Sequence, residues 1–136
     1  MVRIENIQSK LTQLVKYLEL VERYQAQTFS ELLIDPDRLG ACERYLFLAC
    51  QCAIDLAEMT CKIKKLPQPE SMAEAFQNMR QAGLIDDILC TQMIQMVGFR
   101  NALSHGYEKF NYSVLEEVLK NKIKELWRFK DCFESF

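Results

Sequence analysis

One stretch of the sequence, residues 99–107, concentrates side chains that could carry out chemistry. It holds the only histidine of the protein, His105, together with Arg100, Asn101 and Tyr107. An imidazole ordinarily titrates near pH ~6.5, so a histidine can accept and release a proton near neutral pH. Arginine stays charged under the same conditions, and its guanidinium suits a phosphate group. We therefore expect any proton-transfer chemistry of this protein to run through this stretch.

The spacing within the stretch suits the end of a helix. If one helix runs through Arg100, then Asn101 and His105 lie four residues apart on one face of it. Gly106 favours a left-handed helix end, which would leave His105 on the last turn and Tyr107 just outside it. The residues alone leave two interpretations open: a site for acid–base chemistry, or a capped helix with an ordinary surface histidine.

The order Arg100, four residues, His105, one residue, Tyr107 resembles the signature of the HepT-like toxins of the HEPN superfamily. The approach to this motif, Met96-Val-Gly-Phe-Arg-Asn101, is also similar to that family. Two upstream regions resemble the family's second and third helices: Glu43–Leu46 through Ala53–Ala57, and Ala73–Phe76 through Gly83–Ile85. The resemblance covers roughly residues 1 to 130, in the right order.

The resemblance implies an RNA-cleaving toxin, a homodimer whose paired motifs line a cleft. Arg100 and His105 would be the catalytic pair and would cut RNA without a metal ion or cofactor. His105 would remove the proton of a ribose 2′-hydroxyl or protonate the departing oxygen, while Arg100 would hold the phosphate. Asn101 would orient this pair.

The same resemblance implies that Tyr107 is a modification site. In the family, a partner nucleotidyltransferase of the MNT antitoxin type transfers AMP to this tyrosine and silences the toxin. Two rival interpretations remain open: a non-catalytic helical module that docks on a nucleotidyltransferase, and a plain helical scaffold. Ser104 stands where the family more often has an aliphatic residue, and the RNA target is not readable from the chain.

Length and composition predict one domain spanning residues 1–136. Hydrophobic residues make up 49% of the chain and charged residues 26%, which suits a folded core. No apolar run follows a basic start, and none approaches the ~20 residues of a membrane span, so we expect a cytoplasmic protein. The net charge is −2, so any RNA site must be local rather than part of a global basic field.

The six cysteines could suggest a disulfide framework or a metal site, but their spacing favours neither. Four of them fall within one expected helix, and Cys50 and Cys52 are two apart and point to different faces. The protein also has no second histidine to complete a metal site. We expect free cysteines that behave as small apolar core residues.

The apolar pattern predicts an all-α fold, an up-and-down bundle of four main helices plus a short one. No segment alternates as a strand would. The main internal break follows Lys64, where Pro67 and Pro69 exclude a helix. The first helix carries an apolar stripe: Ile4, Ile7, Leu11, Leu14, Leu18 and Val21. The helices after the break are expected at Ser71 to Ala82 (the short one), from Asp86 or Asp87 into the motif, and from about Ser113 to Phe133.

The second helix, from about Asp37 to Lys64, is apolar almost all round and should be the buried centre of the bundle. Gln51, Asp55 and Glu58 interrupt it along one side, and carboxylates in such a place need partners. We expect this polar stripe to face the active cleft or a second subunit. For Asp55, a structural hydrogen bond or ion pair is favoured over a catalytic role.

Gly98 lies inside the helix that enters the motif, where glycine costs about 1 kcal/mol relative to alanine. The usual benefit of a glycine in such a place is room for another backbone. Its position therefore indicates a close approach by a neighbouring helix.

Overall fold

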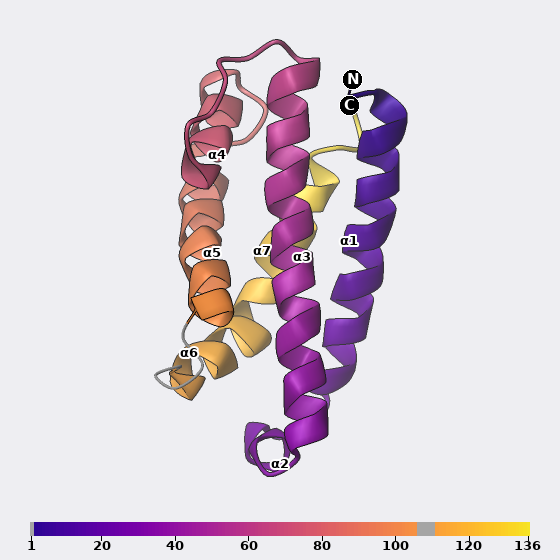
Figure 1. Cartoon of the computed structure of the whole chain (residues 1–136), viewed down its shortest axis with the longest axis vertical. Helices are drawn as coiled ribbons and strands as arrows, with labels where there is room; N and C mark the ends of the chain where they lie inside the picture. The colour runs from indigo at the N-terminus through magenta and orange to yellow at the C-terminus, as the bar shows by residue number, and fades with distance from the viewer. Residues whose placement is uncertain (1, 106–110) are drawn as a thin grey trace.

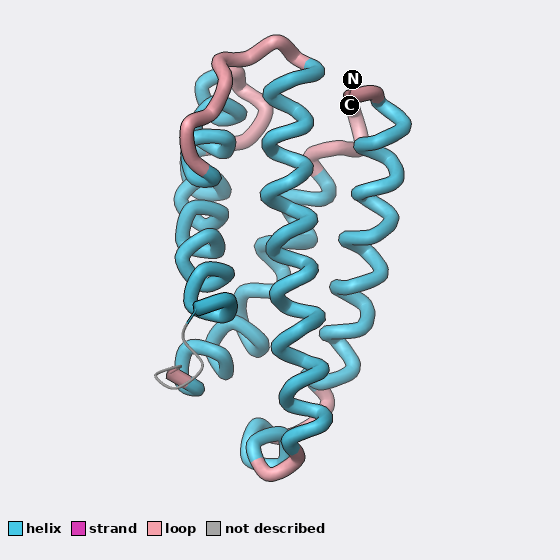
Figure 2. The backbone as a smooth tube through the Cα atoms, in the orientation of Figure 1, coloured by secondary structure: helices cyan, strands magenta, loops and turns pink. Residues whose placement is uncertain are grey.

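The computed structural model describes residues 2–105 and 111–136, and these are helical apart from short connections (Figures 1 and 2). No strand occurs within these ranges, so the predicted all-α class is confirmed. In chain order the elements are α1 (Ile4–Gln25), α2 (Phe29–Leu33), α3 (Pro36–Ile63), α4 (Met72–Gln81), α5 (Asp87–His105), α6 (Tyr112–Glu117), the π-helical segment η2 (Val118–Lys122) and α7 (Ile123–Asp131).

The predicted short helix is present as α4, and the structure has a further short helix, α2, that the sequence did not predict. It has five residues, and the Thr28 side chain caps it by accepting a hydrogen bond from the backbone N–H of Glu31 (3.3 Å). The final predicted helix is present as α6, η2 and α7 in unbroken succession. Four long helical rods, α1, α3, α5 and the α6–α7 run, therefore form the bundle, as expected.

Local capping explains where several helices begin. Asp35 accepts from the N–H of Arg38 (3.2 Å), and Pro36 follows at the first helical position, where its missing N–H costs nothing. Ser71 caps α4 in the same way (3.1 Å). Asp86, one of the two residues expected at the start of α5, accepts from the N–H of Leu89 at 2.7 Å. Gly83, with a φ of 76°, follows the end of α4.

Helix α3 is the centre of the bundle. In Figure 1 it runs between α1 and α5, with α7 crossing behind it, and it packs against α1, α2, α4, α5 and α7. Its buried residues fall on nearly every side, which confirms the expectation of a central helix: Leu39, Cys42, Leu46, Ala49, Cys50, Cys52, Ala53, Ile54, Leu56, Ala57, Thr60 and Cys61. A central helix of this kind fixes the position of any polar side chain that it carries.

The stripe of α1 faces α3, with four of its six predicted members fully buried: Ile7, Leu14, Leu18 and Val21. Leu11 is half-buried, and Ile4 is 53% exposed. The stripe is therefore correct in direction and too long by one residue at its start.

The cysteines are free, five of them buried and Cys132 half-buried. Burial raises the pKa of the Cys42 and Cys50 thiols to about 12. Buried, protonated thiols of this kind act as apolar packing groups.

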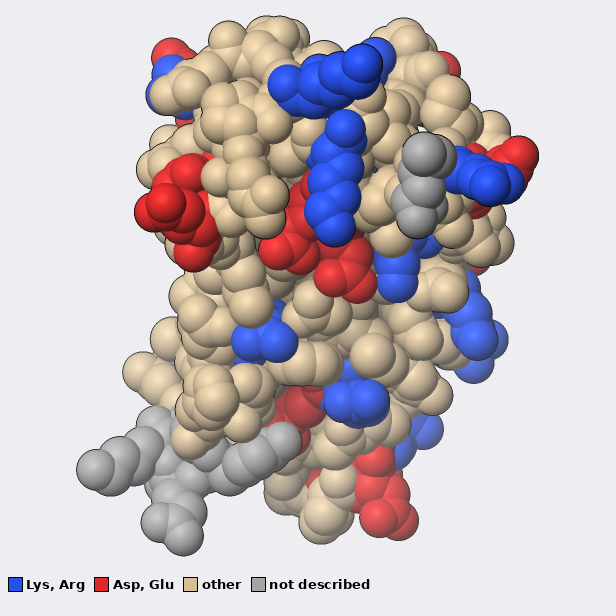
Figure 3. All heavy atoms as spheres, turned by 45° about the horizontal axis from the view of Figure 1, so that its top comes forward, with Lys and Arg blue, Asp and Glu red and all other residues tan. Residues whose placement is uncertain are grey.

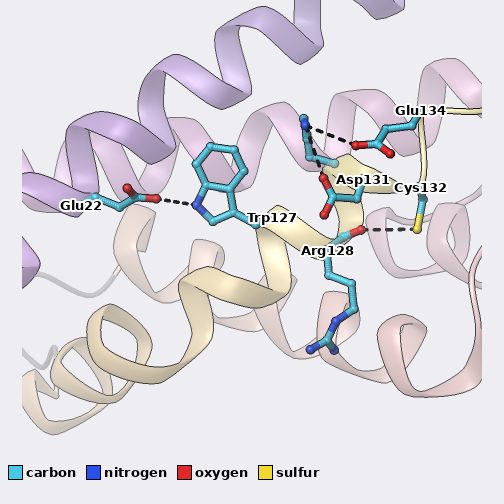
Figure 4. Close-up of polar contacts among 7 residues, drawn as sticks. Glu22, Trp127, Arg128, Asp131, Cys132 and Glu134 are labelled. Carbon is cyan, nitrogen blue, oxygen red and sulfur yellow. Dashed lines mark hydrogen bonds and ion pairs between the residues drawn. The ribbon is translucent and has the colours of Figure 1, made fainter.

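The C-terminal helical run is tied to α1 by two long-range hydrogen bonds. The indole N–H of Trp127 donates to the Glu22 carboxylate at 2.6 Å (Figure 4). The Gln25 amide donates to the backbone carbonyl of Leu119 at 2.8 Å, within the π-helical segment. A π-helical turn displaces backbone carbonyls from their usual partners, and Gln25 satisfies one of them.

The prediction that a neighbouring helix approaches closely at Gly98 is wrong. A Cβ placed there would meet nothing within 4 Å, and the residue is exposed. Gly98 instead borders an apolar hollow of about 370 Å³ between α5 and the α6–α7 run.

None of the helices in the described ranges combines the length and apolar composition needed to cross a bilayer.

Candidate active site

Arg100 is held where α5 lies against α3. Its Nε donates to the side-chain carbonyl oxygen of Gln51 on α3 (3.0 Å), and its Nη1 donates to Oδ1 of Asn101, the next residue (3.0 Å). The Phe47 ring of α3 lies below the guanidinium, with Cζ 5.0 Å from the ring centroid. The side chain is half-buried. Two hydrogen bonds and a ring contact therefore give the guanidinium a defined orientation.

The polar contacts of Arg100 continue across the bundle to α1. The Gln51 amide nitrogen donates to Oδ1 of Asp55 (2.9 Å), and the other oxygen of Asp55 lies 3.3 Å from Nζ of Lys10. The amide orientation of Gln51 is thus set at both ends, by a cation on one side and a carboxylate on the other. The predicted polar stripe does have partners, and Asp55 makes the structural ion pair that was favoured for it.

Glu58, the third member of the predicted stripe, stands apart from this chain of contacts. Burial and the nearby Asp55 carboxylate raise the pKa of its carboxyl, while Lys62 lowers it. Glu58 borders a shallow hollow with Asn101. It therefore lies beside the site without holding Arg100.

Among the residues that the structure describes, no carboxylate neutralises the charge of Arg100. Its two hydrogen-bond partners, Gln51 and Asn101, are neutral amides, and no carboxylate in the described part of the chain comes within 4.0 Å of it. Asp55, which contacts Arg100 only through Gln51, is paired with Lys10 instead. A fixed guanidinium with a free positive charge is suited to bind an anion such as phosphate.

His105 is the last residue of α5, and its side chain is exposed. The description of α5 reaches His105, and Asn101 lies one turn earlier on the same face. Arg100 and His105 are separated by about 7.5 Å along the helix axis, at 1.5 Å per residue. The expected left-handed end at Gly106 and the modification site Tyr107 both lie outside the described residues.

The structure adds two residues that the sequence interpretation missed, Phe47 and Arg44. Both lie on α3, the helix that the sequence predicted to be apolar almost all round. Arg44, Phe47 and Gln51 are spaced three and four apart, which places them on one helix face. That spacing was the available signal, but only the packing of α3 on α5 shows that this face meets Arg100.

The face of the molecule drawn in Figure 3 shows no broad basic surface among the described residues. On the face drawn in Figure 3, Lys and Arg side chains are interspersed with Asp and Glu. Within the described residues, no three His, Cys, Asp or Glu side chains are grouped so that they could hold a metal ion. The chemistry available in the described part of the site is therefore one fixed guanidinium and one exposed imidazole.

A sequence model of the HepT-like ribonucleases matches residues 14–132. This chain belongs to the HepT-like ribonuclease family. The mRNA nuclease HepT of Shewanella oneidensis is 27% identical over 86 residues, which are 63% of this chain and 65% of that protein. The match thus spans slightly less than two thirds of that relative's length.

Solved structures of similar shape agree with the HepT-like assignment. A tri-AMPylated Shewanella oneidensis HEPN toxin, in complex with an MNT antitoxin, superposes with a TM-score of 0.88 at 22% identity, covering 96% of this chain and 97% of that one. A toxin–antitoxin structure with AMP-PNP gives a TM-score of 0.88 at 21% identity, covering 96% and 98%. At these identities the likeness shows the fold, and it confirms the predicted HEPN-like bundle.

Proposed function

We propose that this HepT-like chain is the toxin of a toxin–antitoxin pair and an RNA endonuclease, with Arg100 and His105 as its catalytic residues. The proposal rests on the environment of the Arg100 guanidinium. Its hydrogen-bond partners among the described residues are two neutral amides, so its positive charge is available to bind a phosphate. The exposed imidazole of His105 lies on the same helix end. The family membership supports RNA as the substrate class.

The proposed reaction is an in-line attack of a ribose 2′-oxygen on the adjacent phosphorus. An imidazole takes the 2′-hydroxyl proton, the new P–O bond forms, the bond to the 5′-oxygen breaks, and a protonated imidazole gives its proton to that leaving oxygen. The products are a 2′,3′-cyclic phosphate and a free 5′-hydroxyl. Arg100 stabilises the charge that gathers on the phosphate oxygens, and Asn101 fixes one edge of the guanidinium. This scheme uses no metal ion or cofactor.

The same chemistry supports a homodimer. Base and acid act on opposite sides of the phosphorus, whereas each chain has a single histidine. Two copies of His105 in one cleft would supply both groups. We therefore propose a dimer with the α5 ends of the two subunits facing each other, acting on RNA in the cytoplasm.

Regulation is proposed to occur at Tyr107, by transfer of AMP from a nucleotidyltransferase antitoxin of the MNT type. The tyrosine hydroxyl would attack the α-phosphorus of ATP and release pyrophosphate. The support is its place two residues after His105 in the motif, and the modified toxin and its antitoxin among the structural neighbours. Each added AMP carries negative charge to the neighbourhood of Arg100, where it would compete with RNA phosphate.

Expression of the chain alone tests the proposal, with growth and RNA integrity followed over time. The wild-type chain should stop growth and degrade RNA, whereas Arg100→Ala and His105→Ala should do neither while being produced at equal levels. Co-expression with the nucleotidyltransferase should restore growth and add the mass of one or more AMP groups at Tyr107. A wild-type chain that binds the nucleotidyltransferase but leaves growth and RNA intact would show a docking module instead.

A further inference from the structure

One aromatic ring contacts two arginines beside the motif. The Cζ atom of Arg100 lies 5.0 Å from the centroid of Phe47, and the Cζ atom of Arg44 lies 5.5 Å from the same centroid. The two guanidiniums are therefore at most about 10.5 Å apart. They come from different helices, α5 and α3, and the half-buried ring fixes them relative to one another.

Arg44 has no other role in the described structure. Its side chain is exposed, and neither an ion pair nor a hydrogen bond engages it within the residues described. The neighbouring Glu43 is half-buried, and burial raises the pKa of its carboxyl. Two other arginines do find partners: Arg38 donates to Gln27, and Arg80 pairs with Asp87. Arg44 thus presents a positive charge that no described residue pairs with.

A surface hollow lies between Arg44 on α3 and the last described turn of α5. It has a volume of about 270 Å³ and is bordered on the α3 side by Gly40, Glu43, Arg44 and Phe47, and on the α5 side by Leu103 and Ser104. Ser104 directly precedes His105. A strand of RNA whose phosphate lies on Arg100 would therefore have this hollow next to its cleavage point.

We propose that Arg44 binds a second phosphate of the RNA, the one adjacent to the scissile phosphate on Arg100, with the intervening nucleotide over the hollow. This inference rests on the proposed ribonuclease function and adds a substrate-binding residue to it. Guanidiniums bind phosphates through paired N–H donors, and two of them at a fixed separation select an extended single strand. Phe47 acts as the positioning residue for both.

The test is steady-state cleavage of a short single-stranded RNA by Arg44→Ala at several salt concentrations. We expect kcat/KM to fall about tenfold, through a higher KM with kcat within about twofold of wild type. The slope of log kcat/KM against log salt should become shallower by about 0.7, the value for one phosphate contact on a single strand. Arg44→Lys should recover the salt slope, because it restores the charge, and only part of the affinity.

Arg23→Ala is the matched control. Arg23 is an exposed arginine on α1, which lies on the other side of α3 from α5 (Figure 1), and its removal changes the net charge by the same amount. It should leave KM and the salt slope at wild-type values. A wild-type KM and slope for Arg44→Ala, or an equal loss for Arg23→Ala, would overturn the inference while the proposed function stands.

Failure of the proposed function itself gives a different result. If the wild-type chain does not cleave this RNA, binding of the same RNA measured by fluorescence anisotropy decides the role of Arg44. Weaker binding by Arg44→Ala than by Arg23→Ala supports the second phosphate contact, and absence of binding by wild type overturns it. If Arg44→Ala weakens only the complex with the antitoxin, Arg44 belongs to a protein interface and the inference is wrong.

Discussion

Replacing Gln51 with glutamate changes the charge beside Arg100 while keeping the shape of the side chain. In the structure the Gln51 oxygen accepts from Arg100 at 3.0 Å, and the Gln51 amide nitrogen donates to Asp55 at 2.9 Å. In Gln51→Glu the first contact becomes an ion pair and the second a contact between two carboxylates. The guanidinium then has a carboxylate partner before RNA arrives.

The two new electrostatic terms nearly cancel in the stability of the fold. With an effective dielectric constant of about 20, unit charges about 3 Å apart interact by about 5.5 kcal/mol, attractive toward Arg100 and repulsive toward Asp55. Water screens both contacts similarly, because both surround one half-buried side chain. We therefore expect the free energy of unfolding to change by no more than about 1 kcal/mol.

The effect on RNA cleavage should be much larger. A hydrogen bond to a charged group contributes about 1.5–3 kcal/mol, so losing the phosphate contact of Arg100 should lower kcat/KM roughly 10- to 150-fold. The salt slope should also fall by about 0.7. The defect should shrink as the pH falls, because a protonated glutamic acid resembles the amide that it replaced.

Gln92→Glu provides the matched control for this variant. Gln92 also lies on α5 and accepts a hydrogen bond from an arginine, Arg128, at 3.2 Å, but on the side that faces α7. The same charge change there should leave RNA cleavage at the wild-type level. If Gln51→Glu is folded and cleaves RNA like wild type with an unchanged salt slope, the charge of Arg100 is not the phosphate site.

Three further predictions follow from the contacts around the bundle. Lys10→Met should lower the free energy of unfolding by about 1 kcal/mol, measured by urea titration, because it removes a half-buried ion pair; an unchanged midpoint would contradict this. Trp127→Phe should cost at least about 1 kcal/mol, since it removes the 2.6 Å hydrogen bond to Glu22 (Figure 4), and an equally stable variant would show that bond to be energetically silent. At pH 8, iodoacetamide should label Cys132 before Cys50. Burial raises the pKa of Cys50 to about 12, so only about one Cys50 thiol in ten thousand is ionised at this pH. Labelling of Cys50 before Cys132, mapped by peptide mass spectrometry, would contradict this.

The helices that the sequence predicted well are those with long periodic stripes and side-chain caps. The α1 stripe and the expected starts of α4 near Ser71 and of α5 near Asp86 depend on neighbouring residues alone, so they are readable without a fold. Helix α2 was missed because five residues are too few to show a helical period. The π-helical turn at Val118–Lys122 was missed for another reason, since its geometry depends on packing and on the hydrogen bond from Gln25 to the Leu119 carbonyl.

The candidate site shows the same division between local and long-range information. The placement of Asn101 and His105 on one face of α5, one turn apart, follows from helix geometry. The contact between Arg100 and Gln51 joins residues 49 positions apart, so only the pairing of α3 with α5 shows it. The contact between Phe47 and Arg100 is likewise long-range, because the apolar character of Phe47 says nothing about which charged groups approach its ring.

Cleavage of a defined single-stranded RNA by the purified chain, in excess EDTA, tests the central claim most directly. The wild-type chain should produce fragments ending in 2′,3′-cyclic phosphate, with no need for added divalent ions. His105→Ala should be at least about 100-fold slower, because it removes the proton-transfer group, and should melt at the wild-type temperature because its side chain is exposed. Arg100→Ala should show a similar loss of activity. Full activity in either variant, or wild-type activity that EDTA abolishes and a divalent ion restores, would contradict the account.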